Sequence, residues 1–332
     1  MVNRMRVLIL SCNTGGGHNS AGEAIREYIA LKGGQADLID IMSLAGKKAS
    51  RAVGGAYVGI VKHAPHVFGA AYWLAGKISS GRRKSPVYAA NIAVVKYLKQ
   101  YLETHAYDVI VTPHLYAAET LTYMKRHNMV RQKVVAVATD YTCIPFWEET
   151  ECDYYIAPHE DLIAENVRRG MDRSKILPYG IPVSQKFVTC SGGISKEKAR
   201  AMCGLPAGKP VYLVMGGSMG FGKLPDFIKR LQKQCLREEQ IVVICGNNKK
   251  LYEKLNRQFG KQSAIWIIGY TKQVEVYMKA CDVIFTKPGG LTSTEALVMQ
   301  IPIVHMEPIP GCETKNAAFF SSRGMSVTAD GI

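Results

Sequence analysis

The sequence lacks several features, and each absence excludes a class of protein. No run of about 18 apolar residues occurs, so no helix is expected to cross a membrane. The first apolar run, within MVNRMRVLILS, lacks the small-residue cleavage pattern of a signal peptide and is expected to be a strand. The nine cysteines include no CxxC pair, and most lie in apolar contexts such as VVICGN. We therefore expect reduced cytosolic thiols rather than disulfides or zinc ligands.

Acidic residues are absent from one long segment, although the chain as a whole has a net charge of +15. Between Asp40 and Glu103 the charged residues are all basic: Lys47, Lys48, Arg51, Lys62, Lys77, Arg82, Arg83, Lys84, Lys96 and Lys99. Aromatic residues such as Phe68, Tyr72 and Trp73 lie among them. This mixture suits an anionic lipid surface. A nucleic acid or a merely solvated basic face are the alternatives, and no nucleic-acid motif is present.

Apolar runs of strand length alternate with segments of helical spacing along the chain, which predicts parallel sheets covered by helices on both faces. We expect strands at 6–12, 36–42, 108–112, 133–139 and 153–157, then at 211–215, 240–245, 264–268, 282–286, 302–306 and 326–329. Helices are expected at 20–31, 87–102, 160–169, 224–235, 273–280 and 291–299, and the basic segment is expected to form two helices or a helix and a loop. The Pro- and Gly-rich stretch at 176–182, ILPYGIP, is expected to join two Rossmann-like domains, 1–178 and 179–332.

The stretch DVIFTKPGGLTSTEALVMQIPIVHMEPIPGCETKN, residues 282–316, carries the strongest functional signal. A strand, a glycine turn and a helix place backbone N–H groups and a positive helix end at one point, which suits a phosphate. Glu295 lies one turn into that helix and can accept hydrogen bonds from ribose hydroxyls. Glu313 and Asn316 are expected in a second loop that contacts sugar hydroxyls. The alternative is an ordinary strand-turn-helix corner.

KPGGLTSTEAL followed by PIPGCETKN resembles the donor-site signature of the glycosyltransferase family that holds monogalactosyldiacylglycerol synthases, processive diacylglycerol glucosyltransferases and MurG. Cys312 stands where that family usually has glutamine. The resemblance extends to the amino-terminal turn, GGGHNSAG, and over most of the chain. It implies the α/β GT-B fold, with two Rossmann-like domains facing across a cleft. GT-B chains usually close with a helix that returns to the first domain, so we expect that this chain is truncated.

The resemblance implies an inverting enzyme that transfers glucose or galactose from a UDP-hexose to diacylglycerol, at the inner face of the cell membrane. No Asp-x-Asp motif occurs, so we expect neither a metal nor another cofactor at the diphosphate. Backbone N–H groups, helix ends and Lys287 or Lys223 would balance its charge instead. A MurG-like transferase of N-acetylglucosamine to a polyprenyl-linked acceptor and a non-catalytic nucleotide-sugar sensor remain alternatives. An NAD-dependent oxidoreductase is disfavoured because the first turn lacks G-x-G-x-x-G.

Site residues follow from these patterns and from the resemblance. The donor site is expected to contain Gly217, Ser218, Gly220, Gly246, Asn247, Gly269, Tyr270, Pro288, Gly289, Gly290, Leu291, Thr292, Glu295, Glu313 and Asn316. The acceptor and lipid side is expected to contain Gly16, Gly17, Pro65, Trp147, Arg82, Arg83 and Lys84. His18 and Asp140 are the candidate general bases, because a histidine titrates near neutral pH and Asp140 ends a predicted strand. A helix-start histidine and a capping aspartate are their structural alternatives.

Overall fold

The computed structural model describes residues 4–80, 84–216, 224–235 and 238–329. It divides the chain into two compact units, the first formed by residues 1–184 with 309–312 and the second by residues 185–308 with 313–332. The division after Ser184 lies beyond the boundary at residue 178 that the sequence suggested, and the last strand of the first unit is β6 (Ile176–Leu177), which pairs with β5. In the described residues no helix is both long enough and apolar enough to span a bilayer.

The first unit is built on a parallel sheet of six strands in the order β2-β1-β3-β4-β5-β6. The strands are β1 (Arg6–Ser11), β2 (Gln35–Asp40), β3 (Val109–Thr112), β4 (Lys133–Val137), β5 (Tyr154–Ile156) and β6. Alternate residues of β1 enter two cores, because successive side chains of a strand point to opposite faces. Val7 and Ile9 pack in one core, and Leu8 and Leu10 pack in the other. Because all six strands are parallel, their carboxyl ends lie along one edge of this sheet.

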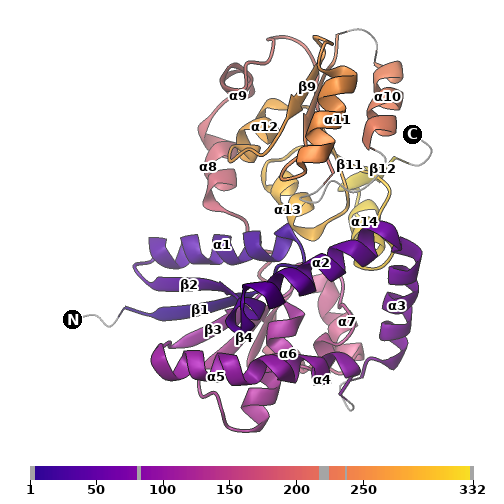
Figure 1. Cartoon of the computed structure of the whole chain (residues 1–332). Helices are drawn as coiled ribbons and strands as arrows, with labels where there is room; N and C mark the ends of the chain where they lie inside the picture. Colours follow the sequence, from indigo (N-terminus) through magenta and orange to yellow (C-terminus); the bar gives the residue numbers. More distant parts are fainter. Residues whose placement is uncertain (1–3, 81–83, 217–223, 236–237, 330–332) are drawn as a thin grey trace. The chain divides into compact units, whose positions relative to one another are not determined.

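The helices of the first unit cover both faces of that sheet. They are α1 (Gly16–Leu31), α2 (Lys47–His63), α3 (Pro65–Ile78), α4 (Pro86–Asn91), α5 (Val95–Thr104), α6 (Leu115–Arg126) and α7 (Ile163–Arg168). Helix α1 lies along one face, and α5 and α6 lie along the other (Figure 1). The basic segment forms the two helices α2 and α3, which confirms one of the two expected forms.

The second unit is also a parallel six-stranded sheet, in the order β12-β11-β10-β7-β8-β9. Its strands are β7 (Val211–Met215), β8 (Gln240–Ile244), β9 (Ile265–Ile268), β10 (Val283–Thr286), β11 (Ile303–His305) and β12 (Ser326–Thr328). Its helices are α8 (Gln185–Gly193), α9 (Lys196–Met202), α10 (Leu224–Gln234), α11 (Lys249–Phe259), α12 (Val274–Ala280), α13 (Gly290–Val298) and α14 (Cys312–Ser321). Apolar side chains of α10 and α11 pack on one face of the sheet.

The predicted strands are confirmed to within one or two residues, but several helices differ from expectation. Helix α1 begins at Gly16 rather than near residue 20, so His18 lies in its first turn. The single helix expected at 87–102 is α4 and α5 with a short 3₁₀ segment, Ile92–Val94, between them. The helix expected at 160–169 likewise begins with a 3₁₀ turn, Glu160–Leu162, before α7. Helices α6, α8, α9, α11 and α14 were not anticipated.

Candidate functional site

In the first unit, the carboxyl ends of β1, β3 and β4 bring four polar side chains together. His18 follows β1, His114 follows β3, and Thr139 and Asp140 follow β4. The rings of His18 and His114 are edge-on, with centroids 4.5 Å apart. Thr139 Oγ1 lies 3.1 Å from His18 Nδ1. The two candidate bases of the sequence therefore lie at the same edge of one sheet, as expected for consecutive βα turns.

The hydrogen bond of His18 fixes the form of its ring. Nδ1 lies 2.8 Å from the carbonyl oxygen of Pro113, which can only accept, so Nδ1 carries the proton of the neutral ring. Nε2 then holds the lone pair. Burial lowers the pKa of His18, while Asp140 and the Pro113 carbonyl oppose that shift only in part. The side chain is thus a neutral imidazole at neutral pH, with Nε2 able to take a proton.

His114 is a site residue that the sequence analysis did not single out. Its Nδ1 accepts from the Tyr116 N–H at 3.1 Å, so Nε2 donates to Thr14 Oγ1 at 2.7 Å. Burial, with His18 as a second cause, holds the pKa of His114 well below the usual range. The ring is uncharged, and its bond to Thr14 joins the end of β3 to the residue before the glycines. Its position directly after a predicted strand was the signal that could have identified it.

Asp140 and the glycines surround this histidine pair. Asp140 is half-buried, and its charge acts to raise the pKa of His18. Gly16 and Gly17 are the first two residues of α1, and Gly15 before them provides no side-chain cap. The first N–H groups of a helix have no acceptor within the helix, so this turn can bind an oxygen of a ligand. The assignment of Gly16 and Gly17 to an acceptor stays a prediction.

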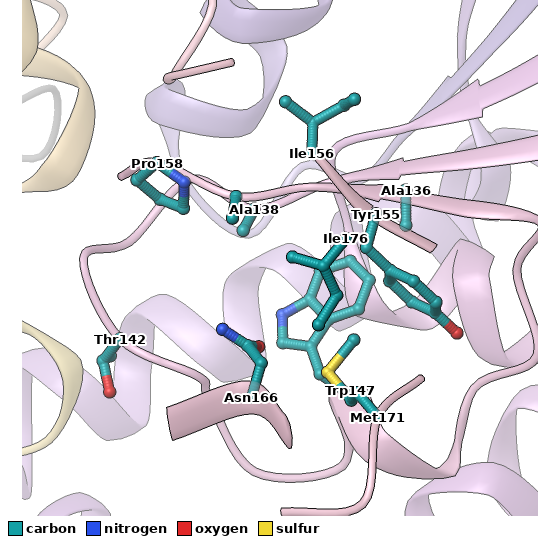
Figure 2. Close-up of a pocket in the computed structure, with 11 residues that line it drawn as sticks. Ala136, Ala138, Thr142, Trp147, Tyr155, Ile156, Pro158, Asn166, Met171 and Ile176 are labelled. Carbon is teal, nitrogen blue, oxygen red and sulfur yellow. The ribbon is translucent and has the colours of Figure 1, made fainter. Parts of the chain in front are cut away.

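Two residues were expected near the lipid headgroup, and the structure describes the side-chain surroundings of one of them. Pro65 begins α3, and its side chain lies outside the described residues. Trp147 is only 6% exposed and packs edge-on against Tyr155 in the core of the first unit. Figure 2 shows Trp147 with Tyr155, Met171 and Ile176 around a small cavity of about 20 Å³. That space holds about one water molecule, and the role of Trp147 at the lipid headgroup stays a prediction.

Lys84 is not a lipid-facing cation in this structure, contrary to expectation. Its Nζ donates to the backbone oxygen of Glu149 and lies 3.3 Å from Glu151 Oε1. The ammonium also lies over the ring of Tyr88, 5.2 Å from its centroid. These contacts join the residue before the cap of α4 to residues 149–151, and they leave the Lys84 side chain half-buried. Arg82 and Arg83 lie outside the described residues.

An exposed apolar surface lies on α3, in the basic segment. Val67, Trp73, Leu74 and Ile78 are between 53% and 66% exposed. Lys77 Nζ lies 5.5 Å from the centre of the Trp73 ring. Exposed apolar groups beside a cation suit the boundary between lipid headgroups and acyl chains.

In the second unit, the turn between β10 and α13 has the geometry that the sequence predicted. Gly289 precedes α13 with no side-chain cap, so the N–H groups of Gly290, Leu291 and Thr292 begin the helix. Asn316 is fully buried, and its Nδ2 donates to the Pro288 oxygen at 3.0 Å. Glu313 and Asn316 lie in helix α14, not in the loop that was expected, because the chain becomes helical at Cys312. Asn316 therefore supports the turn, and a sugar contact for either residue stays a prediction.

Lys287 and His305 are two further buried side chains at or near this turn. Lys287 is 8% exposed, and burial lowers the pKa of its ammonium, while Glu313 and then Glu307 oppose the shift. His305 joins α13 to β12, since its Nε2 is 3.0 Å from Ser293 Oγ and its Nδ1 is 3.0 Å from Ser326 Oγ. Burial lowers the pKa of His305 to about 4, so it makes these contacts uncharged.

Glu295 is half-buried in α13 and has an unusual charge environment. Burial raises the pKa of its carboxyl to about 8; Lys186 opposes this shift and Glu275 adds to it. Lys186 Nζ is itself 3.3 Å from Glu275 Oε2. A carboxyl group that changes charge near neutral pH beside a phosphate-type turn is a mark of a functional site. No sequence pattern had indicated Lys186 or Glu275.

The other expected donor residues follow strands of the same sheet. Gly246 and Asn247 follow β8, and Gly246 has a φ of +56°, which glycine adopts without strain. Gly269 and Tyr270 follow β9, and Tyr270 is exposed. Gly217, Ser218 and Gly220, as well as Lys223, lie outside the described residues. Across 4–80, 84–216, 224–235 and 238–329, no group of three or more His, Cys, Asp or Glu side chains is arranged to hold a metal ion.

Two family models match the chain and together cover most of both units. Residues 18–183 match the monogalactosyldiacylglycerol (MGDG) synthase model. Residues 211–327 match the glycosyltransferase family 28 C-terminal domain.

Curated relatives give the same result over different shares of the chain. A processive diacylglycerol beta-glucosyltransferase of Staphylococcus saprophyticus is 35% identical over 193 residues, which are 58% of this chain and 48% of that enzyme. A probable chloroplastic monogalactosyldiacylglycerol synthase 2 of Oryza sativa is 29% identical over 345 residues, 97% of this chain and 70% of the plant protein. The chain thus spans about half the length of the bacterial relative.

Solved structures resemble the fold at low sequence identity. MurG of Acinetobacter baumannii has a TM-score of 0.60 at 15% identity, with 98% of this chain and 86% of MurG covered. HepE of Anabaena, solved in complex with UDP-glucose, has a TM-score of 0.52 at 13% identity, with 94% and 82% covered. These likenesses, with the two parallel sheets, confirm the expected GT-B fold of two Rossmann-like domains.

Proposed function

The chain belongs to the monogalactosyldiacylglycerol synthase family, and from this premise we propose that it transfers a hexose from a UDP-sugar to diacylglycerol. The product would be a β-glycosyldiacylglycerol. The curated relatives named as diacylglycerol glucosyltransferase and monogalactosyldiacylglycerol synthase support this substrate class. The neutral imidazole of His18, with Nδ1 held by the Pro113 carbonyl, is the observation that carries the proposal.

The second unit binds the UDP-sugar in this proposal. The first turn of α13 receives the diphosphate on backbone N–H groups, and its positive helix end adds to the attraction. Glu295, one turn further along, accepts hydrogen bonds from the ribose hydroxyls. Lys287 balances part of the phosphate charge, with Glu313 beside it. These preorganised donors stabilise the UDP leaving group without a metal.

The first unit supplies the base. As the diacylglycerol oxygen bonds to the anomeric carbon, Nε2 of His18 takes its proton and the bond from that carbon to the UDP oxygen breaks. The imidazolium that forms keeps Nδ1–H on Pro113, and the nearby Asp140 carboxylate stabilises the positive charge. A single displacement of this kind converts an α-linked donor to a β-glycoside. Asp140 is thereby the residue that orients and supports His18 rather than the base.

The acceptor remains in the bilayer, so the enzyme acts at its surface. Cations of the basic segment attract an anionic leaflet, at about 1 kcal/mol each near the headgroups. The exposed α3 residues, Trp73 among them, enter the interface once the protein is close. We place this interaction at the inner face of the cell membrane, where UDP-sugars are available to a cytoplasmic enzyme.

The test is a turnover assay with liposomes that contain diacylglycerol. UDP-glucose, UDP-galactose and UDP-N-acetylglucosamine are supplied separately, and the lipid product is identified by mass spectrometry. Transfer of glucose or galactose to diacylglycerol supports the proposal and identifies the hexose. Transfer of N-acetylglucosamine to a polyprenyl acceptor alone would replace it with a MurG-like function. Tight UDP binding without transfer to any lipid would indicate a nucleotide-sugar sensor.

A further inference from the structure

Helix α2 meets the glycine turn before His18 at a point where only glycine fits. A Cβ on Gly54 would lie 2.4 Å from the carbonyl oxygen of Asn13, far closer than real Cβ contacts. The neighbouring Gly55, in the same helix, has nothing within 4 Å of its Cβ position. The close approach is therefore a property of one residue of α2 and of the Asn13 backbone.

The side chain of Asn13 joins the same two elements through polar contacts. Its Nδ2 donates to Asp40 Oδ2 at 2.8 Å and to Ser50 Oγ, in the first turns of α2, at 3.3 Å. Its Oδ1 accepts from Asn19 Nδ2 at 2.7 Å, and Asn19 directly follows His18. Asp40 Oδ2 also accepts from Ser50 Oγ, so the carboxylate bridges the end of β2 and helix α2.

These contacts connect α2 to the histidine through a short path. Asn19 Oδ1 accepts from Ser11 Oγ at 2.6 Å, which ties the first turn of α1 to the end of β1. The position of His18 matters because its Nδ1 must stay within hydrogen-bond distance of the Pro113 oxygen, which is 2.8 Å away. A displacement of the turn would lengthen that bond and change the direction of Nε2.

We propose that Asn13 is a positioning residue, and that its contacts with Gly54 and Ser50 of α2 set the orientation of the His18 ring. The inference rests on the proposed function only where turnover is measured. Helix α2 also packs against α3, whose exposed residues are proposed to meet the membrane. The link through Asn13 thus lies between α2, which packs on α3, and His18.

A matched pair of glycine variants tests the proposal. Gly54→Ala forces α2 away from Asn13, whereas Gly55→Ala places the same methyl group in open space on the same helix. We expect Gly54→Ala to lower the turnover number by about 10- to 100-fold, since small misplacements of reacting groups have effects of this size. UDP affinity should stay at the wild-type value, and Gly55→Ala should resemble wild type in both measurements.

A spectroscopic measurement separates positioning from general loss of structure. In protein labelled with ¹⁵N-histidine, the His18 ring nitrogens should report the Nδ1–H tautomer in wild type and Gly55→Ala, and an altered tautomer balance or pKa in Gly54→Ala. The exposed His127, which is stacked on Tyr123, should keep its own signals. Identical His18 spectra and turnover in the two glycine variants would overturn the proposal.

Asn13→Ala provides a second test that introduces no clash. It removes the three side-chain hydrogen bonds and leaves the backbone contact with Gly54, so it should change the His18 spectrum and lower turnover. If Gly54→Ala does not fold, an unchanged His18 spectrum in Asn13→Ala decides against the proposal. If the wild-type protein transfers no sugar to any lipid, the proposed function fails, and the spectra still decide whether Asn13 positions His18.

Discussion

The turn after β1 and the turn after β10 share one plan, in which a buried strand leads through glycine into a helix that has no side-chain cap. They differ in how they are held. The first is held partly by its own side chains, since Asn13 and Thr14 bond to Asp40 and His114. The second is held from outside, by Asn316 on Pro288 and by His305 on Ser293.

This difference indicates a division of chemistry between two similar corners. The first turn has an imidazole in its first helical turn and a fixed tautomer for that ring. The helix after the second turn begins with Gly290 and Leu291. It therefore offers backbone N–H groups and no titrating side chain in these first positions. A glycine turn opens the helix end in both units, and the residues that follow decide whether a proton or a phosphate is handled there.

The largest effect should follow from His18. We expect His18→Ala to lower the turnover number by about 10² to 10⁴, because the base is lost, with UDP affinity unchanged. His127→Ala, at an exposed histidine stacked on Tyr123, is the control and should behave as wild type. Steady-state kinetics and calorimetry with UDP measure the two quantities. Near-normal turnover in His18→Ala together with an inactive Asp140→Asn would make Asp140 the base.

The donor turn should respond in affinity instead. At a pH above about 8, where its carboxyl is ionised, Glu295→Gln should raise the dissociation constant of UDP by roughly tenfold or more, given ~1.5–3 kcal/mol for a hydrogen bond to a charged group. Because the pKa of Glu295 is raised to about 8 and the carboxylate accepts more strongly than the acid, wild-type affinity should rise from pH 6 to pH 8. This rise should be absent in Glu295→Gln and present in Glu253→Gln, an exposed control. Calorimetry showing equal UDP affinity in all three proteins would remove Glu295 from the site.

Membrane binding should depend on the first unit alone. Replacing Arg82 and Arg83 by Ser should weaken binding to phosphatidylglycerol liposomes by up to ~2 kcal/mol, at about 1 kcal/mol per cation. Binding should also weaken with salt, because surface potentials are screened within about 8–10 Å. Lys84 is left unchanged because its contacts are internal. Replacing the exposed Lys254 and Arg257 of the second unit should have no effect, and salt-insensitive sedimentation with neutral liposomes would contradict electrostatic docking.

The smallest effect should be on stability. Glu119, in α6, is fully buried, and among the described residues neither of its carboxyl oxygens has a hydrogen-bond partner of regular geometry. Burial, then Glu149, raises its pKa from 4.5 to about 9. Between those values the native state keeps a proton that the unfolded state releases, so stability falls as pH rises.

Glu119→Gln should therefore make the fall in melting temperature between pH 6 and pH 8 shallower, by roughly 2–4 °C for an effect on the order of 1 kcal/mol. The exposed Glu103→Gln serves as the control. Calorimetric scans with the same pH slope in both variants would mean that Glu119 titrates normally.

The strands and the donor turn could be predicted because their signals are local. Buried parallel strands appear as short apolar runs, and some end directly before a glycine or a polar residue, as β9 does before Gly269 and β10 before Lys287. The helix expected at 87–102 is divided after Asn91, whose carbonyl oxygen accepts a hydrogen bond from Thr120 Oγ1 of α6 at 3.1 Å. Nothing in the local spacing marks that position.

The site was predicted in part for the same reason. His18 and Glu295 adjoin glycine turns, so the motif itself pointed to them. His114, Lys186 and Glu275 are near them only through the fold, at sequence distances that no motif spans. The partners of Lys84 likewise lie at residues 149–151, beyond any local pattern, so its charge suggested a lipid contact that the structure does not support.

The most direct test of the central claim, that His18 is the base of a single displacement at the anomeric carbon of the donor sugar, is the anomeric configuration of the product. The enzyme is incubated with diacylglycerol liposomes and the α-linked UDP-hexose that it accepts, and the glycolipid is analysed by proton NMR. A single displacement predicts only the β-glycoside. An α-glycoside would require retention of configuration, and the role of His18 as the base of a direct attack would then be wrong.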